Sequence, residues 1–269
     1  MEWWEALVLG LVEGLTEYLP VSSTGHLILV QRALGIEEGE AANAYAICIQ
    51  AGAIVAVLGL YWSRVRQMVT GLRGRDPEGL RLAFAIVAAF VPAAVVGLLF
   101  NDWIEARLFG LKPVVGAWFV GGLAILLVAR ARRDATPRQG LALSELRVPG
   151  AFVIGAFQCL ALWPGTSRSL VTIVGGLVVG LSLSAAVEFS FLLGVVTLLA
   201  ATAYKALDAG PLMLETYGIS TLLLGTFSAW LFAVLSVKWM VSWLQQHGLA
   251  VFGWYRIALA LVVAVLWWG

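Results

Sequence analysis

The sequence predicts an all-α integral membrane protein with six transmembrane helices and two re-entrant helix–loop–helix hairpins in an inverted-topology repeat. Three observations support this prediction. The 269 residues are 61% hydrophobic and 12% charged, whereas soluble domains have about 45–50% apolar and about 25% charged residues. Two long apolar regions are interrupted at their centres by proline and hydroxyl residues. Most of the arginines gather in two connections.

About 20 mostly apolar residues are needed for an α-helix to cross a bilayer. Six segments qualify: 44–62, 82–100, 113–130, 185–206, 217–244 and 251–268. No linker or change of composition separates them, so we expect a single membrane domain spanning 1–269. The N-terminus, MEWWEALV, has acids where a signal peptide has basic residues, and no removable leader is expected. The net charge of +1 gives no indication of nucleic acid as a partner.

Two further apolar regions, 3–34 and 148–181, are each broken at the centre, by 19-LPVSST-24 and by 163-WPGTSRS-169. Proline removes a helical hydrogen bond and biases the preceding residue away from helix. The hydroxyl residues that follow are good N-caps for a new helix. Each half is too short to span the bilayer, so we interpret both regions as re-entrant hairpins. Such hairpins are tolerated where protein surrounds them or where they line a wet cavity.

Ten of the 17 basic residues lie in or beside two connections. The connection between the spans 44–62 and 82–100 has Arg64, Arg66, Arg73, Arg75 and Arg81. The connection after the span 113–130 has Arg130, Arg132, Arg133, Arg138 and Arg147. The 35–43 connection has three glutamates and no basic residue. The positive-inside rule then places both arginine connections in the cytoplasm. The first hairpin therefore enters from the outer side and the second from the inner side.

Each half of the chain then has one hairpin and three spans in opposite orientations, with repeat one at about 1–130 and repeat two at about 148–269. The sequence shows the repeat faintly. The matched residues are Gly10 with Gly155, Glu13 with Gln158 and, after a slip of one residue, Pro20, Ser22 and Ser23 with Pro164, Thr166 and Ser167.

The first break gathers polar residues that are costly inside a membrane and therefore indicate function. Glu13 and Glu17 are four residues apart, on one helix face. They could hold a divalent cation through oxygen ligands, or one could carry a proton and act as acid or base, or both could face water at the interface. The hydroxyls of Ser22, Ser23 and Thr24 begin the next helix, where they cap it or help to bind an anion, and His26 follows within one turn.

The second break adds Arg168, whose fork of donors matches phosphate oxygens. A structural ion pair with one of the two glutamates is the alternative. The hydroxyl residues around Arg168 are Thr166, Ser167, Ser169 and Thr172. Together the two breaks predict a phosphate-binding site. Gln50, Gln158 and Glu188 are polar residues within apolar segments and are candidates for lining the same cavity.

The stretch EGLTEYLPVSSTGH at 13–26 and the motif PGTSRS at 164–169 resemble the signature regions of the BacA-type undecaprenyl-pyrophosphate phosphatases. The resemblance covers essentially the whole chain, including 45–62 and 188–194. It implies six spans with two re-entrant hairpins, and hydrolysis of a C55 polyprenyl diphosphate to the monophosphate and inorganic phosphate. That reaction recycles the lipid carrier for cell-wall synthesis. Bacitracin, to which the family is linked, sequesters the same lipid.

By this resemblance Glu13 and Glu17 bind a divalent cation, Mg²⁺ or Ca²⁺, and do acid–base work. Ser23 corresponds to the favoured nucleophile, with His26 as its acid–base partner or itself the nucleophile, and activated water is a further alternative. Glu17 is a second candidate for the proton acceptor. Arg168 corresponds to the diphosphate-binding arginine, with Ser167 and Thr172 beside it. One departure is Leu170, where the family usually has glycine, which affects the shape of the pocket.

The resemblance places the protein in the bacterial inner membrane, with its site open to the periplasm or cell exterior and in contact with membrane lipid. A lipid-phosphate flippase or secondary transporter is the alternative function, because broken helices, inverted repeats and a charged central site also characterise transporters. A Ser–His–Glu cluster favours the enzyme, since a carrier needs no nucleophile. The sequence leaves monomer and homodimer both open.

Overall fold

The computed structural model describes residues 1–108, 110–132 and 135–268, and no strand occurs in these ranges. The long helices are α3 (Glu40–Leu60), α5 (Pro77–Leu108), α6 (Leu111–Ala131), α9 (Leu183–His247) and α10 (Ala250–Trp268). The shorter helices are α1 (Trp3–Thr16), α2 (Ser23–Ala33), α4 (Trp62–Leu72), α7 (Val148–Gln158) and α8 (Arg168–Val178), with the 3₁₀ turns η1 (Leu143–Glu145) and η2 (Cys159–Leu162). The all-α prediction is confirmed for these residues.

Five of these helices, α3, α5, α6, α9 and α10, are long and apolar enough to cross a membrane. Many of their large apolar side chains are exposed on the protein surface, for example Leu98, Leu127 and Leu223. Soluble proteins do not expose apolar surface on this scale. The fold is therefore that of a multi-pass membrane protein.

Helix α9 is interrupted at one residue. It has 65 residues, which at 1.5 Å per residue would be about 97 Å of straight helix, about three times the hydrocarbon thickness of a bilayer. Gly218 has a non-helical backbone with φ of 78°, a conformation that glycine adopts without steric cost. The helix consists of a first limb, 183–217, and a second limb, 219–247. The sequence predicted a connection at 207–216, but these residues are helical.

The contacts of α3 show that the two limbs run in opposite directions. On the second limb, the Tyr45 hydroxyl donates to the Thr221 carbonyl at 2.8 Å, and Gly52 lies against Thr226 further along both helices. On the first limb the order is reversed, because Gln50 bonds to Thr202 whereas Tyr61, which caps the end of α3, packs against Phe191. The chain therefore turns back at Gly218, and α3 packs against both limbs.

Both broken regions have the short helices that the sequence predicted. Helix α1 has 14 residues, and α2, α7 and α8 have 11 each. At 1.5 Å per residue these are about 21 Å and about 17 Å long, less than the bilayer core of about 30 Å. The breaks between them, 17–22 and 159–167, contain the predicted proline and hydroxyl residues.

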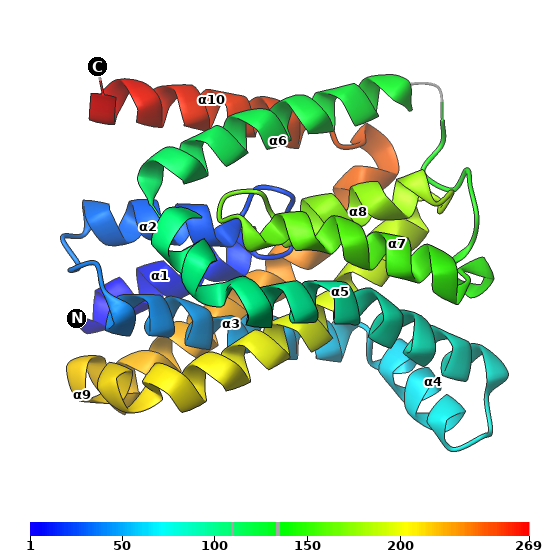
Figure 1. Ribbon diagram of the computed structural model, residues 1–269, viewed down its shortest axis with the longest axis horizontal. Coiled ribbons are helices and arrows are strands. Elements are labelled where there is room, and N and C mark those ends of the chain that lie inside the picture. Colours follow the sequence, from blue (N-terminus) through cyan, green and yellow to red (C-terminus); the bar gives the residue numbers. More distant parts are fainter. Residues whose placement is uncertain (109, 133–134, 269) are drawn as a thin grey trace.

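The two hairpins open towards opposite ends of the molecule (Figure 1). The first, α1–α2, opens towards the end that carries the N-terminus and the α2–α3 connection, and the second, α7–α8, opens towards the end that carries the α4–α5 turn. Helix α1 packs on the second limb of α9, where Ser228 donates to the Leu7 carbonyl at 2.8 Å. Helix α7 packs on α5, where the Ala89 carbonyl approaches Gly155.

The tips of the hairpins meet inside the protein. Tyr18 and Val21 of the first break belong to the same buried apolar cluster as Leu170 and Ile173 of α8. In Figure 1 the tips lie between the α6–α10 pair and the layer that contains α3, α5 and α9. Side chains from two distant parts of the sequence are thereby brought into one site.

Candidate active site

A serine with positive φ precedes the new helix at each break. Ser22 has φ of 74° before α2, and Ser167 has φ of 78° before α8. Among the described residues, these are the two non-glycine residues with positive φ. Such conformations cost about 1–3 kcal/mol each and concentrate at functional sites. The two serines have the same separation in sequence as Gly10 and Gly155, so the helix starts match without the slip of one residue that the sequence comparison required.

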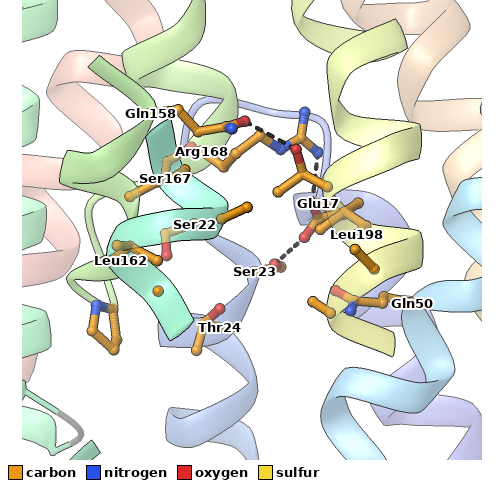
Figure 2. A pocket seen from close by; sticks show the side chains of 18 of the residues that line it. Glu17, Ser22, Ser23, Thr24, Gln50, Gln158, Leu162, Ser167, Arg168 and Leu198 are labelled. Atoms are coloured by element: carbon orange, nitrogen blue, oxygen red, sulfur yellow. Dashed lines mark hydrogen bonds and ion pairs between the residues drawn. The ribbon is translucent and has the colours of Figure 1, made fainter. Parts of the chain in front are cut away.

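An ion pair joins the two tips. Arg168 Nη2 donates to Glu17 Oε1 at 2.8 Å, and the hydroxyl of Ser23 donates to Oε2 of the same carboxylate. The side chains of Arg168 and Glu17 are only 9% and 7% exposed. Glu17 therefore binds the arginine of one break with one oxygen and the serine of the other with its second oxygen (Figure 2).

The guanidinium of Arg168 is held on three further sides. Its Nη1 donates to the Ser190 carbonyl at 3.0 Å, and its carbon lies 5.2 Å from the centre of the Tyr18 ring, a cation–π geometry. Gly194 of α9 leaves the necessary room, since a Cβ there would lie 2.3 Å from Nη1. The Nε of Arg168 is buried and has no hydrogen-bond partner among the described residues. The Nε–H group is therefore not used in binding to the described part of the protein.

The other hydroxyls of the second break mostly hold the two tips together. Ser169 donates to the Leu19 carbonyl at 2.8 Å, and the hydroxyls of Ser167 and Ser169 lie 3.0 Å apart. Thr172 donates to the Arg168 carbonyl at 2.8 Å and hydrogen-bonds with Ser190 at 2.7 Å. Of these predicted residues, Ser167 lines the cavity described next, whereas Ser169 and Thr172 are buried within the protein.

A cavity of about 380 Å³ lies in front of the ion pair. Its polar lining residues include Glu17, Ser22, Ser23, Thr24, Gln50, Gln158, Ser167, Arg168 and Thr197. Its apolar lining residues include Phe90, Leu98, Leu162 and Leu198. Figure 2 shows Ser22, Ser23 and Thr24 lying at the start of one helix and Arg168 with Ser167 on the other break. The cavity therefore offers polar partners for an anionic group and apolar surface for a hydrocarbon chain.

Gln50 and Gln158 line this cavity as predicted, each tied to a threonine of α9. Gln50 donates to Thr202 at 2.9 Å, and Gln158 accepts from Thr197 at 3.2 Å. Glu188 does not line it. Its carboxylate accepts from Arg64 Nε at 2.7 Å and lines a separate cavity near Ser184, because the start of α9 lies far along the helix from Thr197 and Thr202.

Glu13 lies one turn before Glu17 on the same helix face, since the Glu17 amide donates to the Glu13 carbonyl at 2.9 Å. Glu13 is 1% exposed, and its Oε1 has no hydrogen-bond partner among the described residues. It lines a smaller cavity of about 100 Å³ that shares Ser23, Thr24 and Gln50 with the larger one. A buried carboxylate oxygen with no donor, beside hydroxyl and amide oxygens, fits a hard divalent cation.

His26 lies on the side of α2 away from the cavity. Its Nδ1 donates to the Ser22 carbonyl at 2.6 Å, and its Nε2 hydrogen-bonds with the Tyr255 hydroxyl at 2.7 Å. The ring also packs against Trp118. Both nitrogens are therefore occupied, and the side chain that contacts Ser23 is Glu17. The structure places His26 where it supports the backbone of Ser22.

Two predicted residues face away from the larger cavity. Thr166 and Leu170 line an apolar cavity of about 290 Å³ between α6, α7 and α8. Leu170 is 3% exposed and its amide donates to the Ser167 hydroxyl at 3.3 Å. Leu170 therefore leaves open the side of the second break that faces the larger cavity.

Three residues near the site had no place in the sequence interpretation: Tyr18, Gly194 and Arg256. Arg256 is completely buried and donates to carbonyls of both breaks. It is the only charged residue in the sequence of the 251–268 span. A charge in such a position indicates function, so this signal was available in the sequence.

The fold and site define a class of helical membrane proteins that bind an anionic group beside an apolar chain. The family described as bacitracin resistance protein BacA matches residues 6–262, and the chain belongs to that family.

Three relatives named as undecaprenyl-diphosphatases are similar over nearly their whole length. The protein from Sorangium cellulosum is 47% identical over 99% of this chain and 86% of its own. That from Ectopseudomonas mendocina is 45% identical over 98% of this chain and 93% of its own. Undecaprenyl-diphosphatase 1 of Chromobacterium violaceum is 43% identical over 98% of this chain and 96% of its own.

Proposed function

We propose that this protein is an undecaprenyl-diphosphatase, which hydrolyses undecaprenyl diphosphate to the monophosphate and inorganic phosphate. The names of the relatives and the family match support this activity. The single observation that carries it is the contact of Arg168 with Glu17 beside Ser23, in a cavity lined by both polar and apolar side chains. The product is the lipid carrier of cell-wall precursors.

The diphosphate would bind between the two tips. Arg168 offers a rigid fork of donors that matches phosphate oxygens, and its Nε has no protein partner. Ser22, Thr24 and Ser167 line the same part of the cavity. The start of α2 adds backbone N–H groups and the positive end of the helix dipole. These groups together supply the positive potential that a diphosphate requires.

The prenyl chain would leave the site along the apolar lining residues. Phe90 and Leu98 of α5 line the cavity, as do Leu162 and Leu198. The remainder of a C55 chain is far longer than the cavity and would lie in lipid. Strong binding is therefore needed at the head group alone, which fits the concentration of polar residues at the tips.

The chemical step follows from the Ser23–Glu17 hydrogen bond. Glu17 takes the proton of the Ser23 hydroxyl, and Oγ attacks the terminal phosphorus. A bond forms between Oγ and this phosphorus while its bond to the bridging oxygen breaks, and undecaprenyl monophosphate leaves. Glu17 passes this proton to the departing monophosphate and is a carboxylate again. It then takes a proton from the water that attacks the phosphoserine, the bond between Oγ and phosphorus breaks, inorganic phosphate leaves, and Glu17 returns the proton to Ser23. Such reactions ask the protein mainly for positioning and charge stabilisation, which Arg168 provides.

Direct attack by water is the alternative mechanism, with Glu17 accepting a proton from water and Ser23 orienting it. His26 is a supporting residue in both schemes. Its bond to the Ser22 carbonyl holds the helix start on which Ser23 depends, and its other nitrogen is occupied by Tyr255.

A divalent cation, Mg²⁺ or Ca²⁺, fits the acidic pair. Within the described ranges no group of three or more His, Cys, Asp and Glu side chains surrounds a single point, and Mg²⁺ at phosphate sites commonly uses one or two carboxylates plus the substrate phosphates. Glu13 and Glu17 would hold it, since Glu13 Oε1 lacks a donor. When bound, the cation would partly neutralise the negative charge of the diphosphate.

The arrangement in the membrane that we propose has six spans, with α9 contributing two, and two re-entrant hairpins. The turn at Gly218, the short helices and the opposite openings of the hairpins support it. The connections rich in arginine would be cytoplasmic, and the protein would lie in the bacterial inner membrane. The first hairpin would then enter from the periplasmic side, where the substrate head group would reach the site.

The transporter alternative is less well supported. A carrier needs ligands for phosphate, but it has no use for a carboxylate that accepts a hydrogen bond from a serine beside them. The three relatives described above are all named undecaprenyl-diphosphatases.

The experiment that tests the activity is phosphate release from undecaprenyl diphosphate by the purified protein, with and without EDTA. Wild type should release phosphate and should lose this activity with EDTA. Ser23→Ala, Glu17→Gln and Arg168→Ala should be reduced by two orders of magnitude or more, the scale on which removal of one stabilising group acts. Cys159→Ala, at a residue outside the site, is the control. Equal release by all variants would remove the catalytic assignment.

A further inference from the structure

Arg256 of α10 is 0% exposed, yet no acidic side chain in the described part of the chain pairs with it. An arginine buried in a membrane span is costly unless its donors are satisfied. Because Arg256 lies close to both hairpin breaks, groups of the breaks are candidates for accepting hydrogen bonds from its donors.

All five N–H donors of the guanidinium bind backbone carbonyls. Nε donates to Trp118 at 3.3 Å, and Nη1 donates to Pro20 at 3.2 Å and to Thr166 at 3.1 Å. Nη2 donates to Ala117 at 2.8 Å and to Gly165 at 2.9 Å. An arginine has five such donors and no more. The side chain is therefore fully used, and every acceptor is a main-chain oxygen.

These carbonyls belong to three separate segments. Pro20 is in the first break, Gly165 and Thr166 are in the second, and the remaining two are on α6. Carbonyls at a helix break lack the hydrogen bonds of a continuous helix, and at membrane depth each unsatisfied group costs several kcal/mol. Arg256 satisfies the carbonyls of both breaks at once and thereby fixes one tip relative to the other.

The reacting groups follow closely in sequence. Ser23 lies three residues after Pro20, and Arg168 lies two residues after Thr166. A shift of either carbonyl would move the hydroxyl and the guanidinium relative to each other. We propose that Arg256 is a positioning residue, which aligns Ser23 with Arg168 across the diphosphate by holding the backbones of both hairpin tips.

The surroundings are shaped for this role. A Cβ on Gly121 of α6 would lie 2.1 Å from Arg256 Nη2, so glycine is required for the guanidinium to reach its carbonyls. Trp118 reinforces the first tip from the same helix, because its Nε1 donates to the Val21 carbonyl at 3.1 Å. Lysine cannot replace the arginine, since it has three donors on a single nitrogen.

The test uses Arg256→Lys and Gly121→Ala in the full-length protein in detergent. The control is Arg64→Lys, which alters a partly exposed ion pair between Arg64 of α4 and Glu188. Hydrogen–deuterium exchange is followed by mass spectrometry across the chain. In both variants, exchange should rise in 17–24 and in 163–169 and remain close to wild type in α3. The control should show neither increase.

Activity supplies a second readout, which rests on the function proposed above. The kcat of both variants should fall about 100-fold, the cost of misplacing reacting groups by about 1 Å. KM should change little, because Arg168 still binds the diphosphate. Exchange that rises evenly through all helices, with kcat per folded molecule unchanged, would show that Arg256 only stabilises the core. If wild type releases no phosphate, the proposed function fails, while the exchange result still decides the role of Arg256.

Discussion

At the scale of single residues, Arg168 is the side chain around which the site is arranged. It contacts Glu17, the Ser190 carbonyl and the face of Tyr18. Glu17 and Tyr18 are neighbours in the first break and Ser190 is on α9, and together these contacts fix the plane of the guanidinium. A fixed plane matters because bidentate recognition of phosphate depends on the direction of the donors.

The first prediction concerns Gly194, which leaves room for this plane. In Gly194→Ala the new methyl group would lie 2.3 Å from Arg168 Nη1, so the guanidinium must move. We expect kcat/KM for undecaprenyl diphosphate to fall at least 10-fold, a transition-state loss of about 1.4 kcal/mol. Gly210→Ala is the matched control on the same limb of α9, because no atom lies within 4 Å of the added group. Equal activity of the two variants would contradict this account of Arg168.

The residues of the site could be predicted to a large extent, but the sequence could not choose among their alternative pairings. Glu17, Ser23 and Arg168 were expected together because polar groups at two membrane breaks must satisfy one another. His26 was expected beside Ser23 from its spacing of three residues, yet the rotation of α2 directs it to Tyr255. Arg256 lies in a different helix, and its five carbonyl partners became visible only in three dimensions.

At the scale of the elements, the two breaks determine where the site forms. Each break begins its second helix directly after a serine with positive φ, so the first residue of the helix is turned towards the partner tip. Proline and hydroxyl residues made both breaks predictable. The connection predicted between the spans 185–206 and 217–244 was placed wrongly, because 207–216 is helical and the backbone reverses at Gly218.

The second prediction concerns the backbone at Ser22. Its φ of 74° is unfavourable for any residue with a Cβ and most unfavourable for a β-branched one. Ser22→Gly should unfold in detergent at the same temperature as wild type or a higher one, since glycine removes a strain of about 1 kcal/mol or more. Ser22→Val should unfold at a clearly lower temperature.

Ser220→Val is the control for that pair, since Ser220 is an exposed helical residue of α9 and tolerates the same change of side chain. A Ser22→Val variant as stable as Ser220→Val would show that the helix start of α2 carries no strain of this kind.

At the scale of the whole molecule, the hairpins open in opposite directions while the long helices surround them (Figure 1). The packing partners of the two hairpins correspond, because α1 lies on the second limb of α9 and α7 lies on α5. These partners occupy comparable places in the two predicted repeats, 1–130 and 148–269. The correspondence supports the inverted repeat, which the weak sequence match alone could only suggest.

The third prediction follows from the placement of the arginine connections. In a background with Cys48→Ala and Cys159→Ala, single cysteines are placed at two exposed sites, Glu38→Cys and Arg138→Cys. A membrane-impermeant maleimide added to intact spheroplasts should label position 38, and position 138 should react only after the membrane is permeabilised. The reverse pattern would invert the orientation, and labelling of both sites in sealed cells would contradict the proposed number of spans.

The fourth measurement tests most directly whether the two tips form one catalytic site. Glu17→Gln, Arg168→Lys and the double variant are compared with wild type by kcat/KM for undecaprenyl diphosphate. Residues in direct contact couple strongly, whereas distant residues act additively. Because Glu17 and Arg168 share an ion pair of 2.8 Å, the double variant should lose much less activity than the product of the two single losses. A loss equal to that product would mean that the two residues act independently and that the tips do not meet across one diphosphate.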